Sequence, residues 1–304
     1  MHIVIAGGSG FLGNALGRAL ARDGHELTIL SRGSSGGDRT KPGRHVQWTP
    51  DGSAGPWAAS IDGADAVVNL AGESIAAKRW TAAQKQRILD SRVQATRSLV
   101  AAIRTAKAPP AIFVSGSAVG YYGPLGDEPA PEEHAPGSDF LANVCMQWED
   151  EAMRAAGGQT RVVCIRTGLV LARHEGALPK MLPPFWFGTG GPVGSGRQYW
   201  PWIHHQDWVD LVRFAIHTPA VSGPLNATAP TPVTNADFAR ALGRALRRPA
   251  FMPTPGLALR LMLGEMADAL LLSGQRAIPA RAERLGHPFA FKELDSALRA
   301  IFGR

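Results

Sequence analysis

Short apolar runs alternate with amphipathic stretches over about the first 170 residues of the chain. Six apolar runs predict strands, at residues 3–6, 26–30, 45–48, 66–71, 111–115 and 162–167. Three stretches with helical spacing predict helices, at 11–22, at 139–156 and around a stripe formed by Ile88, Ala95, Leu99 and Ile103. Strands that alternate with helices form a parallel sheet, and right-handed crossovers place the helices on both faces. The pattern therefore predicts an α/β protein with a doubly wound parallel sheet.

The pattern changes after residue 168. Residues 176–202 are rich in glycine, proline and aromatic residues, which is typical of loops over a site. Residues 207–217 predict a helix that rejoins the sheet, and residues 235–304 predict a small, mainly helical region. We therefore predict a sheet domain and a substrate-cap region, the former comprising 1–168 with 203–230 and the latter 169–202 with 231–304.

The composition is that of a globular protein: 304 residues, 45% hydrophobic and 19% charged, with enough chain to bury a core. No run of 18 apolar residues predicts a membrane span. The N-terminus lacks the basic start of a secretion signal and turns glycine-rich after a short apolar run. We therefore expect a cytoplasmic protein without membrane association, in which Cys145 and Cys164 are reduced.

The formal net charge of +7 raises the question of nucleic acid binding. Residues 235–304 carry 11 Lys and Arg against 6 Asp and Glu, so most of the excess is C-terminal. These arginines are scattered at helical spacing among alanine and leucine, which favours solvated helix faces over a nucleic acid site. We expect no nucleic acid partner; the alternative predicts duplex binding that weakens roughly tenfold or more between 50 and 200 mM salt.

The first predicted strand runs into the glycine turn Gly7-Gly8-Ser9-Gly10-Phe11-Leu12-Gly13. In a dinucleotide-binding turn the first glycine permits a tight bend, the second lets a pyrophosphate approach, and the third lets the helix pack against the strand. The helix then presents its first N–H groups, beginning at Phe11 and Leu12, to the phosphates. Since this turn follows a strand and opens a helix, it predicts a Rossmann fold that binds a dinucleotide.

The end of the second predicted strand indicates which dinucleotide binds. An acidic residue there would hold the ribose 2′-hydroxyl of NAD, but this chain has Ser31-Arg32. A hydroxyl beside a guanidinium suits a 2′-phosphate. We therefore predict NADP as the cofactor, the alternative being that Arg32 is a solvated loop residue.

Further motifs resemble the extended short-chain dehydrogenase/reductase superfamily. They are the glycine turn, Asn69-Leu70-Ala71-Gly72, residues 115–123, Arg166-Thr167-Gly168 and residues 202–207. Other segments are similar to its atypical "epimerase family" branch: 71–75 with Arg79-Trp80, 90–92, 181–185, 194–197 and 226–230. The resemblance covers essentially the whole chain.

This resemblance implies additional cofactor-binding residues: Leu70, Ala71, Gly72, Glu73, Arg87, Arg92 and Arg166. Without the resemblance, arginines on a helix would be expected to face solvent. The superfamily also lines its substrate cleft with the segment that here contains His204, His205 and Asp207. We expect no metal there, because His-His-x-Asp lacks the helical i, i+4 histidine pair.

One departure from the superfamily concerns its catalytic machinery. The superfamily uses a tyrosine followed four residues later by a lysine, whose ammonium lowers the phenol pKa. The residues four beyond Tyr121, Tyr122 and Tyr199 are Leu125, Gly126 and Ile203. The aligned positions look like Leu141 and Cys145, with Glu149 one turn later. The usual proton-transfer mechanism therefore cannot be carried over directly.

Two residues are candidates for direct catalytic contact. Ser117 matches the superfamily's catalytic serine and could hydrogen-bond a substrate carbonyl, and Tyr122 matches a tyrosine just beyond it. A phenol without a lysine is a weak base at neutral pH, since its pKa is about 10. For both residues the alternative is loop packing.

We interpret the chain as an NADP-dependent oxidoreductase or epimerase-like enzyme that acts on an unknown small metabolite. The competing class is a non-catalytic NADPH-binding sensor or regulatory protein, suggested by the missing Tyr/Lys pair. A homodimer is an expectation that the sequence neither supports nor opposes.

Overall fold

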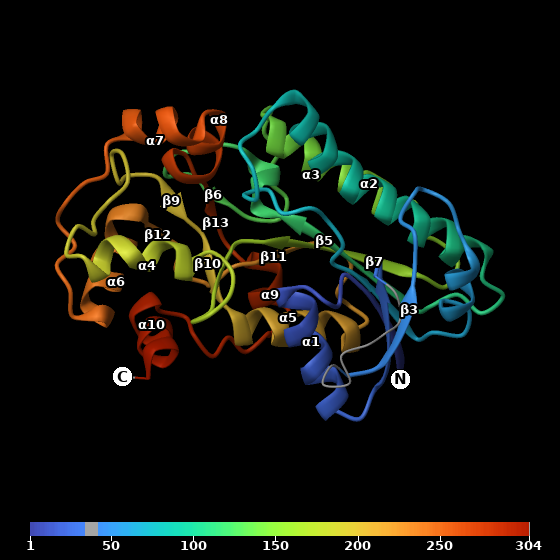
Figure 1. Cartoon of the computed structure of the whole chain (residues 1–304). Helices are drawn as coiled ribbons and strands as arrows, with labels where there is room; N and C mark the ends of the chain where they lie inside the picture. The colour runs from blue at the N-terminus through green and yellow to red at the C-terminus, as the bar shows by residue number, and fades with distance from the viewer. Residues whose placement is uncertain (34–41, 304) are drawn as a thin grey trace.

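The computed structural model describes residues 1–33 and 42–303. Within these residues, a parallel seven-stranded sheet has the order β11-β7-β5-β4-β1-β2-β3 (Figure 1). Its strands are β1 (His2–Ala6), β2 (Glu26–Ser31), β3 (Arg44–Gln47), β4 (Ala66–Asn69), β5 (Ile112–Ala118), β7 (Arg161–Thr167) and β11 (Gly223–Ala227). The chain moves outward from β1 in both directions, which confirms the doubly wound α/β fold.

Helices cover both faces of the sheet (Figure 1). They are α1 (Phe11–Arg22) and α5 (His205–His217) on one face, and α2 (Ala82–Thr105) and α3 (Phe140–Met153) on the other, with the 3₁₀ turns η1 (Pro56–Ser60) and η2 (Val119–Tyr122). Side chains of β1 alternate between the two layers: Ile3 and Ile5 pack with α1 and α5, and Val4 and Ala6 pack with α2. Burial on both faces explains why β1 is an unbroken apolar run.

The predicted strand at 66–71 ends earlier than expected, at Asn69. The Ala71 N–H donates to Asn69 Oδ1 at 3.1 Å, while Asn69 Nδ2 donates to Thr96 Oγ1 at 2.9 Å. An asparagine side chain that binds the backbone two residues on forms a turn in place of the next ladder position. This turn ends β4 and starts the next loop, in which the Leu70 backbone lies against Gly7 at the carboxyl end of β1.

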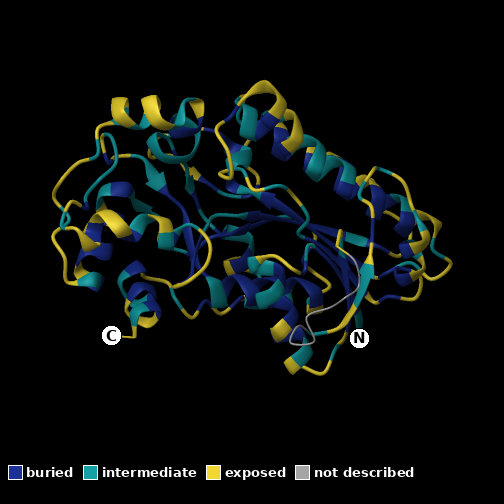
Figure 2. Cartoon of the chain, in the orientation of Figure 1, coloured by how far each residue is buried: buried dark blue, intermediate teal, exposed yellow. Residues whose placement is uncertain are grey.

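The rest of the chain forms a second region beside the sheet (Figure 1). Its helices are α4 (Leu178–Trp186), α6 (Asn235–Leu246), α7 (Gly256–Leu263), α8 (Glu265–Ala267), the π-helical turn η3 (Asp268–Leu272) and α10 (Leu294–Phe302). Its short strands are β6 (Pro129–Ala130), β8 (Leu169–Leu171), β9 (Tyr199–Trp200), β10 (Trp202–His204), β12 (Val233–Thr234) and β13 (Arg276–Ala277). Three of the helices, α4, α6 and α10, share one core with Trp200 and Trp202. Helix α9 (Ala280–Arg284) instead returns to the sheet, where Ala282 is buried in the core that β11 and α5 share. Figure 2 shows exposed residues along α7 and buried residues through the sheet.

Sequence analysis predicted loops at 176–202, but α4 lies there. The prolines of this segment favoured a loop in the sequence, but the helix accommodates them. Pro179 occupies the first turn, where a missing N–H costs nothing, and Pro183 and Pro184 lie inside a helix of nine residues. Leu178, Leu182 and Phe185 are buried at helical spacing. Burial of this apolar face outweighs the intrinsic penalty of proline, so tertiary packing decides the conformation here.

Candidate functional site

The predicted cofactor residues lie at the carboxyl ends of parallel strands. The glycine turn follows β1, Ser31 ends β2, and the loop at 70–73 follows β4. Because β1 pairs with both β2 and β4, these three segments meet at one edge of the sheet. Ligands of doubly wound sheets bind at this edge, where the strand order reverses.

The glycine turn has the geometry of a phosphate cradle. Gly7 has a φ of 79°, and a Cβ built on it would lie 2.6 Å from the Leu70 carbonyl carbon. A Cβ on Gly13 would lie 2.4 Å from the Gly7 oxygen, whereas a Cβ on Gly10 would meet no atom closer than 3.4 Å. Gly7 and Gly13 are therefore needed for packing, while the space above Gly10 is open for a ligand.

The start of α1 supports the same use. Gly10 is its N-cap and is extended, with no side-chain cap and no acidic residue in the first turn within this described segment. The N–H groups of a first helical turn lack intrahelical partners, and the helix dipole adds positive potential. The turn thus offers free donors to an anion above Gly10.

The end of β2 lies beside the glycine turn. Gly7 N–H donates to the Leu30 oxygen at 3.4 Å, and the Ser31 oxygen accepts from Trp48 N–H at 3.0 Å. Ser31 is half-buried and Arg32 is exposed. The structure thus places the predicted 2′-phosphate residues next to the turn; the adjoining residues 34–41 lie outside the described part of the chain.

The loop after β4 is held by the start of α2. Glu73 N–H donates to Ser91 Oγ at 3.0 Å, and Glu73 Oε1 accepts from Gln84 Nε2 at 2.8 Å. Arg87 donates to Gln84 Oε1 at 2.6 Å, and its Nε lies 4.0 Å from Glu73 Oε1. Glu73 and Arg87 are therefore brought together by a glutamine that the sequence analysis did not single out.

Arg92 lies underneath this loop. Its Nη1 donates to the oxygens of Glu73 and Ile88 at 3.0 and 2.9 Å, and its Cγ and Cζ lie 3.3 Å from where a Gly72 Cβ would stand. The guanidinium also faces the Trp148 ring, 5.3 Å from its centroid. Burial lowers the Arg92 pKa. Arg92 therefore joins the loop after β4 to α3. The sequence predicts that α3 is the helix in which the superfamily carries its lysine.

The sequence predicts that Leu141 and Cys145 stand where the superfamily has its Tyr/Lys pair, and this assignment stays a prediction. Leu141 packs against Gly120 and belongs to a cluster with Trp80 and Ile88. Cys145 is buried, its Sγ lies 3.6 Å from the Ala118 oxygen, and burial raises its pKa to about 12. Neither side chain can exchange a proton with a substrate at neutral pH.

A buried charged pair lies one turn further along α3. Arg166 Nε and Nη2 donate to Glu149 Oε1 and Oε2, both at 2.8 Å, and Ser117 Oγ donates to Glu149 Oε1 at 2.6 Å. Burial lowers the Arg166 pKa. The hydrogen bonds to Glu149 and the charge of that carboxylate raise this pKa by more, so the net shift is upward. Arg166 therefore stays a cation, and its two bonds hold Glu149 in place as an acceptor for Ser117.

Tyr122 belongs to the same network. Its hydroxyl donates to Asn226 Oδ1 at 2.8 Å and accepts from Arg166 Nη1 at 3.0 Å. Burial raises the Tyr122 pKa to about 12, and the residue is 1% exposed. The catalytic role predicted for Tyr122 stays a prediction, and these contacts speak against it. They likewise place Arg166 among protein partners, while its predicted cofactor contact also stays a prediction.

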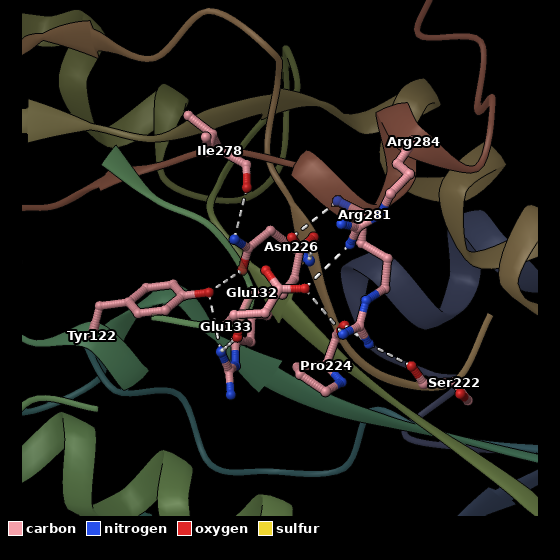
Figure 3. Close-up of polar contacts among 10 residues, drawn as sticks. Tyr122, Glu132, Glu133, Ser222, Pro224, Asn226, Ile278, Arg281 and Arg284 are labelled. Carbon is pink, nitrogen blue, oxygen red and sulfur yellow. Dashed lines mark hydrogen bonds and ion pairs between the residues drawn. The ribbon is translucent and has the colours of Figure 1, made fainter. Parts of the chain in front are cut away.

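The network continues into the C-terminal region through residues that the sequence analysis missed (Figure 3). Buried Glu132 accepts from the N–H groups of Asn226 and Arg281, both at 3.0 Å, and burial raises its pKa. Asn226 Nδ2 donates to the Ile278 oxygen at 2.8 Å. These bonds tie β11 to the segment before α9. Neither an asparagine in a strand, such as Asn226, nor a glutamate in a loop, such as Glu132, carries a sequence signal for such a contact.

The segment at 204–207 has structural partners. His204 Nδ1 accepts from the Gln206 N–H at 3.2 Å, and burial lowers the His204 pKa to about 4. The Asp207 carboxylate accepts from the N–H groups of Ala290 and Phe291, at 2.8 and 2.9 Å. Asp207 thus anchors α5 to the segment that leads into α10.

The fold and site belong to a recognised class of protein. Residues 3–227 match the model of the NAD-dependent epimerase/dehydratase family, and residues 254–301 match a domain of unknown function, DUF1731. The chain therefore belongs to the NAD-dependent epimerase/dehydratase family.

Within this family, the chain is similar over its full length to epimerase family protein SDR39U1. It is 40% identical to the human protein, covering 99% of each chain, and 42% identical to an epimerase family protein of Mycobacterium leprae, covering 97% of this chain and 94% of that one. The crystal structure of human SDR39U1 (isoform 2) with NADPH matches with a TM-score of 0.90, 38% identity and full coverage of both chains. This bears out the resemblance that the motifs indicated.

More distant structures share the fold alone. UDP-glucuronic acid 4-epimerase from Bacillus cereus, with UDP-glucuronic acid and NAD, matches with a TM-score of 0.76 at 14% identity.

A related protein of Arabidopsis thaliana, 39% identical over 99% of this chain, carries the description chloroplastic in its name. In this chain, none of the helices formed by residues 1–33 and 42–303 has the length and apolarity needed to cross a membrane.

Proposed function

We propose that the protein binds NADP and acts as an oxidoreductase or epimerase-like enzyme on a small metabolite. The observation that carries the proposal is the glycine turn, whose packing requires Gly7 and Gly13 and leaves the space above Gly10 open. Ser31 and Arg32 beside this turn favour a 2′-phosphate. The NADPH in the human SDR39U1 structure supports the same cofactor.

Arg32→Ala is expected to weaken binding of NADPH about tenfold or more and to change NADH binding little, because the guanidinium would pair with the 2′-phosphate that NADH lacks. Calorimetric titration with both nucleotides measures the effect. Arg104→Ala, which removes an exposed arginine from the last turn of α2, is the control. Equal losses for NADPH and NADH would contradict the assignment of the phosphate to Arg32.

The catalytic part of the proposal rests on Ser117 and Glu149. A bound nicotinamide supplies or accepts hydride. Ser117 donates its proton to Glu149, so the lone pairs on its oxygen remain for a substrate hydroxyl. Ser117 Oγ can therefore accept from such a hydroxyl and hold it for hydride transfer, while the ion-paired Glu149 keeps the serine proton turned away from the substrate and the proton lost on oxidation passes to solvent. This route needs neither a tyrosine nor a lysine.

Ser117→Ala is expected to lower kcat about 100-fold or more and to leave NADPH affinity unchanged, because it removes a group proposed to contact the substrate and not the cofactor. The assay follows NADPH consumption across a panel of carbonyl metabolites. Ser115→Ala on the same strand is the matched control, because Ser115 Oγ bonds only the neighbouring Gly116 oxygen among described residues. An unchanged kcat in Ser117→Ala would remove Ser117 from the mechanism.

A specific observation favours the alternative, a non-catalytic NADPH sensor. Leu141 and Cys145 cannot transfer protons, Tyr122 is held by protein partners, and Ser117 is 5% exposed. Tight NADPH binding by the wild-type protein without consumption across the panel would support the sensor. Consumption with any carbonyl compound would support the enzyme.

A further inference from the structure

A shallow, open hollow lies at the C-terminal end of α6; Figure 1 shows this helix in the region beside the sheet. It has a volume of about 510 Å³ and is lined by Arg240, Gly243, Arg244, Arg247, Arg248, Ala250 and Phe251. None of these residues belongs to the predicted cofactor or catalytic site. The hollow is thus a separate concave surface, with four guanidinium groups around it.

Two of these four arginines have acidic partners and two do not. Arg240 is paired with Asp237 from the same helix, and Arg244 makes a two-pronged contact with Asp295 at 2.8 and 2.9 Å. Within residues 1–33 and 42–303, the guanidiniums of Arg247 and Arg248 make no hydrogen bond or ion pair. The hollow therefore carries two positive charges that its own acidic residues do not balance.

Arg247 occupies a backbone conformation that favours glycine. It caps α6 with φ 55° and ψ 46°, and no other described non-glycine residue has a positive φ. At this position of a helix, glycine avoids the steric cost that a side chain incurs in the left-handed conformation. The arginine persists at the hollow despite this cost. Residues in such conformations cluster at ligand sites.

The walls of the hollow are fixed. A Cβ on Gly243 would lie 2.6 Å from Ala250 Cβ and 2.9 Å from the Arg248 oxygen, so the segment after α6 folds back tightly on the helix. The Arg248 N–H donates to the Gly243 oxygen at 2.9 Å. This segment ends at Phe251, which is 73% exposed and offers an aromatic face beside the guanidiniums.

We propose that this hollow binds a nucleoside phosphate, with the phosphates on Arg247 and Arg248 and the base against Phe251. Guanidinium groups bind phosphate oxygens in pairs, and an aromatic ring stacks on any base. The carboxyl end of a helix carries about half a negative charge, which alone would repel an anion. The two unbalanced guanidinium charges exceed it.

The test is calorimetric titration of the full chain, preloaded with one equivalent of NADPH, with ATP, tripolyphosphate and adenosine. ATP is expected to bind more tightly than tripolyphosphate, and adenosine most weakly. Arg248→Ala is expected to weaken ATP binding about tenfold, and Phe251→Ala to remove the advantage of ATP over tripolyphosphate. Arg104→Ala, on α2, is the matched control and should leave ATP binding unchanged.

Arg247→Gly separates a binding role from a structural one. It is expected to weaken ATP binding about tenfold and to raise the stability of the fold, since glycine relieves the left-handed conformation. Urea denaturation without ATP reads the stability. Unchanged ATP binding in Arg247→Gly and Arg248→Ala, or equal binding of ATP and tripolyphosphate to the wild-type protein, would each overturn the proposal.

Discussion

Gly10→Val will reduce the binding of NADPH and NADH at least 100-fold while the protein stays folded. A Cβ at Gly10 meets only the Gly7 oxygen, at 3.4 Å, and the extended backbone at φ −78° and ψ 173° accepts a branched side chain. The valine would fill the space through which a pyrophosphate approaches the first turn of α1. Calorimetric titration measures the loss, and circular dichroism with urea denaturation measures the fold.

Gly13→Ala is the informative comparison, because it disturbs the packing of α1 against β1 and leaves the space above Gly10 open. Its Cβ would lie 2.4 Å from the Gly7 oxygen and 2.6 Å from Gly8 Cα, so α1 must shift away from β1. Overpacking of this kind costs about 1–3 kcal/mol of stability. Retained nucleotide binding in Gly10→Val would show that the pyrophosphate does not lie over this turn, and would refute the Rossmann interpretation of the site.

Arg166→Met will lower the free energy of unfolding by about 3–5 kcal/mol, because it leaves the Glu149 carboxylate buried without its cation. Arg166 is 3% exposed, and both of its bonds to Glu149 are 2.8 Å long. The same substitution removes a donor from Tyr122 and from the Glu132 oxygen. Urea denaturation followed by fluorescence measures the loss.

Two further variants separate charge burial from simple loss of contacts. Combining Arg166→Met with Glu149→Gln should recover much of the stability, because no buried charge is left and the glutamine oxygen can still accept from Ser117. Arg260→Met breaks the two-pronged but exposed pair with Asp268, and should cost much less stability than Arg166→Met because solvent screens the exposed charges. A loss in Arg166→Met no larger than in Arg260→Met would show that the buried pair contributes little to stability.

The sequence by itself determined the doubly wound α/β fold of this protein and predicted the glycine turn at its first strand. Strand and helix periodicities are local properties, and the right-handed crossover rule converts their order into a doubly wound sheet. The glycine turn could be assigned because its spacing is local: Gly13 packs against the turn itself, Gly7 packs against the loop after the neighbouring strand, and Gly10 leaves open space. Helix α1 begins and ends where the sequence predicted, at Phe11 and Arg22.

The tertiary structure decided which polar side chains meet. Tyr122 was a catalytic candidate by position, yet it binds Asn226, which lies 104 residues later in the chain. Glu132 and Arg281 are 149 residues apart and carry no motif. Contacts of this kind depend on how separate elements pack, and their side chains become fixed only when burial makes an unpaired polar group costly. Local pattern therefore predicted the backbone and the cofactor turn, whereas the network around Glu149 and Arg166 emerged only from the packed fold.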